Sequence, residues 1–220
     1  MLFQRKQPAM ITASEALPGR SIPVPVHGKH LVLGTPLVGP WPEGTTRATF
    51  AMGCFWGAEK FMWKVPGVYS TFVGYAGGYT PNPSYEEVCT QRTGHAEVAV
   101  VIYDPKVVAY ESLLKVFWEN HDPTQWMGQG GDIGTQYRSA IMVEDEEQQA
   151  QAAASRDRYQ TELAKAKYGE IVTQIVPAGT FYYAEDYHQQ YLQRNPMGYC
   201  NHGFCQAAYP VQTGTGATLS

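Results

Sequence analysis

A cysteine stands between a glycine and two large aromatic residues in the segment Gly53-Cys54-Phe55-Trp56-Gly57. A strand pattern over residues 47–51 precedes this segment, and apolar residues at helical spacing follow it as far as Val65. The thiol is therefore expected where a turn opens a helix, and the unpaired N–H groups there favour the nucleophilic thiolate. We interpret Cys54 as a reactive cysteine beside an apolar pocket. The alternative is a small buried hydrophobe, against which the two flanking glycines argue.

The second chemical group is the carboxyl of Glu97, on the clearest strand pattern of the chain, residues 96–103. Apolar side chains occupy both faces of this strand, so both faces are expected to be buried. A buried carboxyl without a cationic partner has a raised pKa and can act as an acid near neutral pH. The local sequence supports a second interpretation equally well. In it, Glu97 is a glutamate at the end of the strand whose carboxyl is satisfied by hydrogen bonds from the preceding turn, residues 93–95.

Two further cysteines, Cys200 and Cys205, lie close together in a Pro- and Gly-containing segment, residues 195–205, which indicates a mobile loop. In a reducing compartment such cysteines are catalytic, metal-binding or inert. A zinc site of Cys200, His202 and Cys205 is the main alternative, but no fourth ligand is evident. We interpret Cys89, in a short helical pattern, as a packing residue.

Composition excludes several classes of protein. The 220 residues are 44% hydrophobic, enough for one substantial core, and the formal net charge of -4 comes without a basic cluster. The electrostatic footprint of a nucleic-acid-binding protein is therefore missing. Polar residues interrupt any apolar run near the start of the chain, so neither a signal peptide nor a membrane span is predicted, and we expect a cytoplasmic protein with no membrane partner.

The elements that must position these groups alternate between strand and helix, which predicts an α/β or α+β domain with helices covering a sheet. Residues up to about 46 show no sustained period and are expected to form an irregular arm over the domain. A long Gly-rich loop over 122–137 is expected to be functional. Strands are predicted over 47–51, 69–75, 96–103, 139–143 and, as one or two strands, 171–183; helices are predicted after Cys54, at 84–89, and over 110–118, 144–168 and 185–193.

Six segments resemble, in family order, those of the A-class peptide methionine sulfoxide reductases, which reduce the S epimer of methionine sulfoxide. The resemblance implies a two-layer mixed β-sheet with helices packed on it and a ferredoxin-like core, and it implies no metal or organic cofactor. With it we divide the chain into an arm (1–46), a catalytic domain (47–195) and a mobile C-terminal segment (196–220). The matching segments are residues 53–57, 83–86, 93–98, 130–139, 184–189 and 195–200.

The resemblance also implies a role for each site residue. Cys54 becomes the nucleophile that attacks the sulfoxide sulfur, and Glu97 the acid that protonates the oxygen, which is otherwise a poor leaving group. The other implied site residues are Tyr85 and Tyr137 as hydrogen-bond donors to the oxygen, Asp132 as the holder of a water, and Phe55 and Trp56 as a cage for the S-methyl group.

Recycling of the enzyme is implied in the same way. Loss of methionine leaves a sulfenic acid on Cys54, Cys200 is the implied resolving cysteine, and Cys205 is implied to pass the disulfide onward for reduction by thioredoxin. Residues 201–204 form a shorter and bulkier spacer than the glycine-rich spacers common in three-cysteine members. Direct reduction of Cys200 by thioredoxin therefore stays open. We expect a monomer that acts on methionine sulfoxide, free or in oxidised proteins.

Two alternatives come from other classes of protein. Acyl transfer would pair Cys54 with His95 or His188, form a thioester and need no Cys200. For His188 a structural hydrogen-bonding role near the site is the preferred interpretation. A non-catalytic thiol module would instead bind zinc or a partner through the Cys200 loop, which metal analysis would test.

Overall fold

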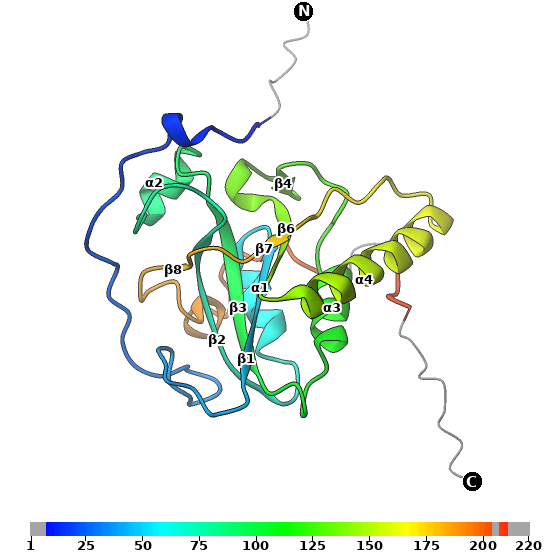
Figure 1. Cartoon of the computed structure of the whole chain (residues 1–220), viewed down its shortest axis with the longest axis horizontal. Helices are drawn as coiled ribbons and strands as arrows, with labels where there is room; N and C mark the ends of the chain where they lie inside the picture. The colour runs from blue at the N-terminus through cyan, green and yellow to red at the C-terminus, as the bar shows by residue number, and fades with distance from the viewer. Residues whose placement is uncertain (1–7, 204–206, 211–220) are drawn as a thin grey trace, which may run out of the picture.

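The computed structural model describes residues 8–203 and 207–210, and a six-stranded mixed sheet forms its centre (Figure 1). The strands lie in the order β7-β6-β1-β3-β2-β8, with β6 and β7 parallel and the other neighbours antiparallel. Their bounds are β1 Thr46–Met52, β2 Val68–Ala76, β3 Ala96–Tyr103, β6 Ser139–Val143, β7 Gln174–Pro177 and β8 Tyr182–Tyr183.

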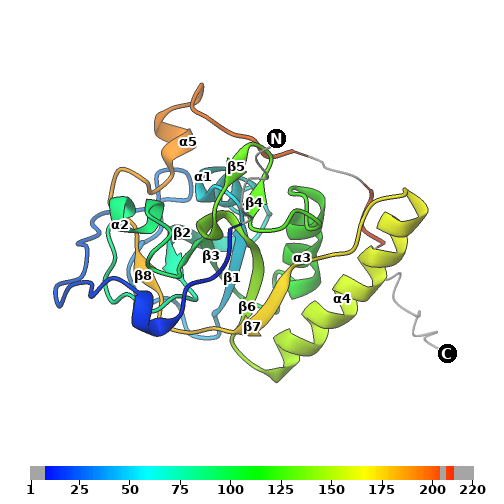
Figure 2. The same cartoon turned by 90° about the horizontal axis from the view of Figure 1, so that it is seen from above.

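Helices cover one face of this sheet. Figure 2 shows α1, α3 and α4 together on that side, where their apolar residues join those of the strands in the main core. Local capping sets where some of them begin: Ser84 accepts the N–H of Glu87 at the start of α2, and Asp145 accepts that of Gln148 at the start of α4. The helices are α1 Phe55–Met62, α2 Tyr85–Cys89, α3 Tyr110–Glu119, α4 Glu146–Lys165 and α5 Tyr191–Arg194, with short 3-10 turns η1 Ala13–Glu15 and η2 Thr135–Tyr137.

The order β1-α1-β2-β3-α3-β6 along the chain, with sheet order β6-β1-β3-β2, is a ferredoxin-like arrangement. Helix α1 connects the parallel strands β1 and β2 on either side of β3, and α3 connects the parallel strands β3 and β6 on either side of β1. The apolar face of the strands is buried beneath α1 and α3. The predicted class, a mixed sheet covered by helices, is confirmed.

The N-terminal arm covers the opposite face of the sheet, where Figure 2 shows it running past the strands. Trp41 stacks on Phe72 of β2 at 5.6 Å between ring centroids, and Leu37 is buried in the second core cluster. His30 of the arm lies at the helix-covered face instead, where it forms a hydrogen bond of 2.8 Å with the Thr71 hydroxyl, which also bonds Glu59 of α1. Both faces of β3 are therefore buried, as the apolar pattern of that strand predicts. The division of the chain into arm, domain and C-terminal segment stays a prediction.

Two local predictions differ from the structure, and a third, over 171–183, is met by one of its two alternatives. The helix expected over 185–193 is wrong, because Gln190 has the left-handed φ of 48° and α5 begins only after it. The single or double strand expected over 171–183 is two short strands, β7 and β8, at opposite edges of the sheet. The long loop over 122–137 contains a small hairpin of β4 (Gly128–Gln129) and β5 (Asp132–Ile133), followed by η2.

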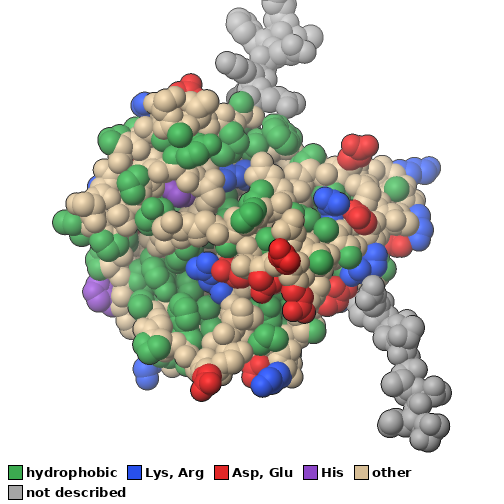
Figure 3. Space-filling view, viewed as in Figure 1, with side chains coloured by type: hydrophobic (Ala, Val, Ile, Leu, Met, Phe, Trp, Pro, Cys, Tyr) green, Lys and Arg blue, Asp and Glu red, His purple; other side chains and the backbone are tan. Residues whose placement is uncertain are grey.

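The surface carries charges of both signs. On the face seen in Figure 3, acidic and basic side chains lie interspersed and form no continuous basic patch. Among the described residues, no helix combines the length and apolarity needed to cross a membrane.

Candidate active site

Cys54 is the N-cap residue of α1, directly after β1, as predicted. The turn between them requires a glycine, since Gly53 has φ +91° and a Cβ at that position would overlap the side chain of Gln129. The Cys54 side chain is nearly buried, with 6% exposed, and the N–H groups of Trp56 and Gly57 donate hydrogen bonds to its sulfur. The start of α1 thus points its free donors at the thiol.

The thiol is nevertheless protonated in the unliganded site. Burial raises the pKa of Cys54 well above its ordinary value, and the nearby carboxylates of Glu97 and Asp132 raise it further. The N–H groups at the helix N-terminus act in the opposite direction but are outweighed. This differs from the thiolate expected from the helix N-terminus alone, so the reaction must include a route for the thiol proton.

Glu97 lies on β3 opposite Tyr75 of β2, and its side chain is 2% exposed. Its Oε2 accepts a hydrogen bond of 3.0 Å from the backbone N–H of Phe55, the residue after Cys54. Burial raises the pKa of Glu97 to about 8, with a further contribution from Asp132, although the Phe55 N–H lowers it. The carboxyl is therefore protonated at neutral pH and joined to the turn that carries the thiol, rather than to the preceding turn at residues 93–95.

Two tyrosines and an aspartate complete the polar side of the site. Burial raises the pKa of Tyr137 above its ordinary value, and the charges of Glu97, Asp132 and Cys54 contribute, which places its hydroxyl among these groups. The pKa of Tyr85, the first residue of α2, is raised by burial, then by Cys89, with which its hydroxyl forms a hydrogen bond, and to a smaller extent by Glu97 and Tyr137. The tertiary structure thus gathers the predicted polar residues around the thiol.

Aromatic rings gather around His188, next to the turn that carries the thiol, and form an aromatic wall. Phe55 is buried and packs on His188 with ring centroids 5.0 Å apart. Trp56 is half-buried, stacks on Tyr191 at 3.8 Å, and donates a hydrogen bond of 2.9 Å from Nε1 to Nδ1 of His188. The Tyr85 ring also contacts His188, at 4.6 Å. His188 therefore holds the aromatic wall together, which agrees with the structural role preferred for it.

The segment around Cys200 is tied across the entrance of the site. The Tyr199 hydroxyl donates to Asp132 at 3.2 Å, and the Asn201 side-chain amide donates to Asp132 and to the Gln129 carbonyl, both at 2.9 Å. Between them Cys200 is exposed, with its Sγ against the first turn of α1. Cys205 lies outside the described residues.

Sequence reasoning missed three contributors. Glu185 accepts hydrogen bonds from the Tyr75 hydroxyl and the Tyr85 backbone N–H, both at 3.0 Å, and so fixes the start of α2 beside the site. Gln129 and Asn201 join the β4–β5 hairpin to the Cys200 segment. Glu185 lies inside one of the six matching segments, which is the signal that could have found it. The packing role predicted for Cys89 is wrong, since the residue is exposed.

The histidines proposed for acyl transfer each have the acceptor nitrogen of the neutral ring taken by an N–H donor, although His188 Nε2 is buried without a hydrogen-bond partner among the described residues. His95 Nε2 donates to the Thr80 carbonyl at 2.7 Å, while its Nδ1 accepts the Gly78 N–H at 3.1 Å. His188 Nδ1 is occupied by Trp56. A Cys-His nucleophilic pair at Cys54 therefore has no base in this geometry.

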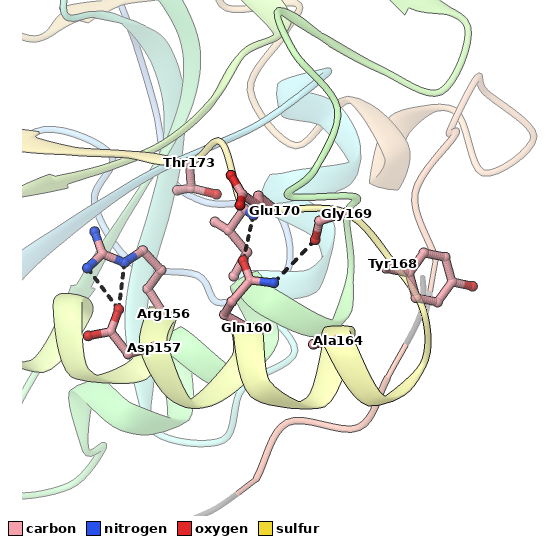
Figure 4. Close-up of a pocket in the computed structure, with 9 residues that line it drawn as sticks. Arg156, Asp157, Gln160, Ala164, Tyr168, Gly169, Glu170 and Thr173 are labelled. Atoms are coloured by element: carbon pink, nitrogen blue, oxygen red, sulfur yellow. Dashed lines mark hydrogen bonds and ion pairs between the residues drawn. The ribbon is translucent and has the colours of Figure 1, made fainter.

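A separate cavity of about 530 Å³ lies between α4 and the segment that follows it (Figure 4). Some of its polar side chains are paired within the lining: Gln160 donates to the Gly169 carbonyl at 3.3 Å and accepts the Ile171 N–H at 2.7 Å, and Arg156 pairs with Asp157. None of the predicted site residues lines it. Within the described ranges, no three His, Cys, Asp or Glu side chains are grouped as they would be around a metal ion.

Comparison with known proteins gives a consistent result. The family model for peptide methionine sulfoxide reductase matches residues 46–214. The peptide methionine sulfoxide reductase MsrA of Salinispora arenicola is 63% identical over 213 residues, 96% of this chain and 97% of that protein. The structure of methionine sulfoxide reductase A of Corynebacterium diphtheriae superposes with a TM-score of 0.80 and 43% identity, covering 93% of this chain and 100% of that one. Mxr1 from Saccharomyces cerevisiae in complex with Trx2 matches at TM-score 0.51 and 25% identity, over 76% of this chain and 95% of that one.

The ferredoxin-like sheet buries a thiol at a helix N-terminus beside a buried carboxyl, in a chain whose relatives are oxidoreductases. The chain belongs to the peptide methionine sulfoxide reductase family and is an oxidoreductase that reduces methionine sulfoxide. The resemblance of the six segments to the A class is confirmed by relatives of that class along nearly the whole chain.

Proposed function

We propose that this protein reduces the S epimer of methionine sulfoxide, free or in proteins, with Cys54 as nucleophile and Glu97 as acid. The observation that carries the proposal is the 3.0 Å hydrogen bond from the Phe55 N–H to Glu97, which holds a buried carboxyl with a pKa of about 8 next to the thiol. A proton donor of this pKa suits a sulfoxide oxygen, whose departure requires protonation.

The reductive step then balances without an external acid. The Cys54 sulfur attacks the sulfoxide sulfur, Glu97 gives its proton to the oxygen, and the carboxylate recovers a proton from the Cys54 thiol. The attack forms a sulfur–sulfur bond, and the protonated oxygen then moves as a hydroxyl group from the substrate sulfur to the Cys54 sulfur. The substrate S–O bond and the sulfur–sulfur bond break, and the new S–O bond makes Cys54 a sulfenic acid. The substrate sulfur gains two electrons and leaves as methionine, and the Cys54 sulfur is the atom that is oxidised.

Selectivity for one epimer follows from the two unlike walls of the site. Tyr85 and Tyr137 supply hydroxyl donors for the oxygen, and Asp132 holds a water in the site. Phe55 and Trp56 enclose the S-methyl group, which every substrate of this class shares. A chiral sulfur held between the apolar wall and the polar donors is open to attack by Cys54 in only one of its two configurations.

Recycling uses the C-terminal cysteines. Cys200 condenses with the sulfenic acid of Cys54 to a disulfide, Cys205 can pass this disulfide onward, and a thioredoxin reduces the final pair. The proposal is supported by the position of Cys200 against the first turn of α1 and by the crystal structure of the related Mxr1 with Trx2. The monomeric state and cytoplasmic location remain predictions.

The test is thioredoxin-coupled turnover of the separated S and R sulfoxide epimers by the wild type and by the variants Cys54→Ser and Glu97→Gln. We expect turnover of the S epimer only, abolished by the first change and lowered by about 10²-fold or more by the second. Equal turnover of both epimers, or full activity of Cys54→Ser, contradicts the proposal.

The relay through Cys205 has a separate test. If Cys205→Ser keeps wild-type turnover with thioredoxin, Cys200 is reduced directly and the relay is wrong. Loss of thioredoxin-coupled turnover with one methionine still formed per enzyme supports it.

A further inference from the structure

His202 lies in the spacer of residues 201–204, which departs from the family pattern. Its ring covers the first turn of α1. Its Nε2 lies 2.6 Å from the carbonyl oxygen of Met52, at the end of β1. Its Nδ1 is buried and, among the described residues, has no hydrogen-bond partner. A buried polar atom without a partner is costly, so this nitrogen calls for an explanation.

The hydrogen bond to Met52 fixes the tautomer of the ring. A carbonyl oxygen only accepts, so Nε2 must carry the hydrogen. Burial lowers the pKa of His202 to about 4, so the ring is neutral and Nδ1 has a free lone pair. The titratable neighbour on the α3 side is His121, whose pKa is lowered to about 3 by burial and which is likewise neutral.

The His202 ring and the thiol of Cys200 both lie against the same glycine of α1. A Cβ placed on Gly57 would overlap Nδ1 of His202 and would stand 3.0 Å from Sγ of Cys200, so the two atoms share the space over this glycine. The N–H of the same Gly57 donates to the sulfur of Cys54. The nucleophilic sulfur, the resolving sulfur and the imidazole are thus gathered around one residue of α1.

We propose that His202 positions the resolving thiol, with Nδ1 accepting the Cys200 S–H hydrogen bond and then its proton as the disulfide forms. The proposal rests on the proposed function, since it needs the sulfenic acid on Cys54. A thiolate that develops beside the ring favours the charged imidazolium, because opposite charges a few ångströms apart stabilise each other. His202 therefore becomes a stronger base at the moment when Cys200 attacks.

The step balances within the site. The Cys200 sulfur forms the S–S bond to Cys54, and the S–O bond of the sulfenic acid breaks with its electron pair on oxygen. The proton that Nδ1 took from Cys200 passes to the departing hydroxide, which leaves as water. The Cys200 sulfur is oxidised and the Cys54 sulfur is reduced from sulfenic acid to disulfide.

A matched pair of variants separates the role of Nδ1 of His202 from that of Nε2. His202→Gln keeps a donor that can reach the Met52 carbonyl but removes the acceptor beside Cys200, whereas His202→Asn keeps an acceptor near the Nδ1 position. Each full-length protein is mixed with one equivalent of methionine sulfoxide, and methionine release and loss of free thiols are followed separately. We expect methionine release at the wild-type rate in both variants. Disulfide formation should slow by about tenfold or more in both variants, because neither amide can take up a proton, and by more in His202→Gln, which also lacks an acceptor for the Cys200 S–H.

The pH profile adds a readout that a purely structural role would leave unchanged. Without the base, the Cys200 thiol must lose its proton to solvent before it can attack. The rate of disulfide formation should then rise about tenfold per pH unit below the thiol pKa, while the wild-type rate varies much less. The proposal is overturned if His202→Gln forms the disulfide at the wild-type rate with the wild-type pH profile. It is also overturned if the variant slows methionine release and disulfide formation equally. If wild type releases no methionine, the proposed function itself has failed.

Discussion

The backbone N–H of Phe55 donates a hydrogen bond of 3.0 Å to Oε2 of Glu97, and so joins the acid on β3 to the residue that follows the nucleophile on α1. The bond fixes the carboxyl without supplying a cation, and burial therefore remains the dominant influence on its pKa. Proton supply at this site consequently depends on packing rather than on an ion pair.

The pH dependence of the reductive step should reflect Glu97. Because only the protonated carboxyl can act as an acid, methionine formation in a single turnover should fall as the pH rises through about 8. Glu97→Gln should lower the rate by about 10²-fold or more and remove this fall. A wild-type rate that stays constant well above the pKa of Glu97 would rule out the assignment.

The buried carboxyl of Glu97 should lower the free energy of unfolding at pH values above the pKa of a free glutamate. Its pKa in the folded state, about 8, lies above the unfolded value of about 4.3, so the folded state keeps a proton that the unfolded state has lost. Its contribution to the free energy of unfolding thus falls as the pH rises between these two values. Glu97→Gln should be more stable than wild type by about 1–3 kcal/mol at pH near 8 and by less near 5, measured by urea unfolding.

A second buried carboxyl is present in both wild type and Glu97→Gln, so its contribution to the pH dependence of stability cancels when the two proteins are compared. Glu59 also has its pKa raised by burial, to about 7, although Gln190 and Thr71 donate hydrogen bonds to it. A difference between wild type and Glu97→Gln that does not change with pH would contradict the raised pKa of Glu97.

Gly57→Ala should block recycling rather than reduction. Alanine normally favours a helix by about 1 kcal/mol over glycine, but here the Cβ would overlap His202 and press on Cys200. We expect one methionine per enzyme at near the wild-type rate, followed by disulfide formation slowed by about tenfold. Gly131→Ala is the control, because nothing lies within 4 Å of a Cβ there. Equal disulfide rates in the two variants would show that Cys200 does not react from this position.

Trp56→Phe should weaken substrate binding. The change keeps an aromatic ring against Tyr191 but removes the Nε1 donor to His188, which orients the aromatic wall. Loss of one such bond is worth about 1 kcal/mol, so kcat/KM for methionine sulfoxide should drop about fivefold, mainly through KM. Trp118→Phe, which loses a buried bond to Ser155, should lower stability and leave KM unchanged. A Trp56→Phe enzyme with unchanged KM would exclude Trp56 from the substrate wall.

The sequence alone determined the elements that carry the chemistry. The N-cap position of Cys54 and the buried strand of Glu97 follow from local periodicity, which depends only on neighbouring residues. The matching segments also contain Tyr85, Asp132 and Tyr137, which the fold brings near Glu97. The helix over 185–193 could not be rejected in this way, because the left-handed Gln190 is held by contacts with Glu59 on α1.

Only the tertiary structure decided how these groups behave. The pKa of Cys54 depends on what buries it and on the carboxyls of β3 and β5, none of which is near it along the chain. The exposure of Cys89 and the contact of His202 with Met52 likewise arise from segments far apart in sequence. Local patterns place a residue on an element, whereas burial and electrostatics depend on the segments that fold over it, and these set the protonation states that the reaction uses.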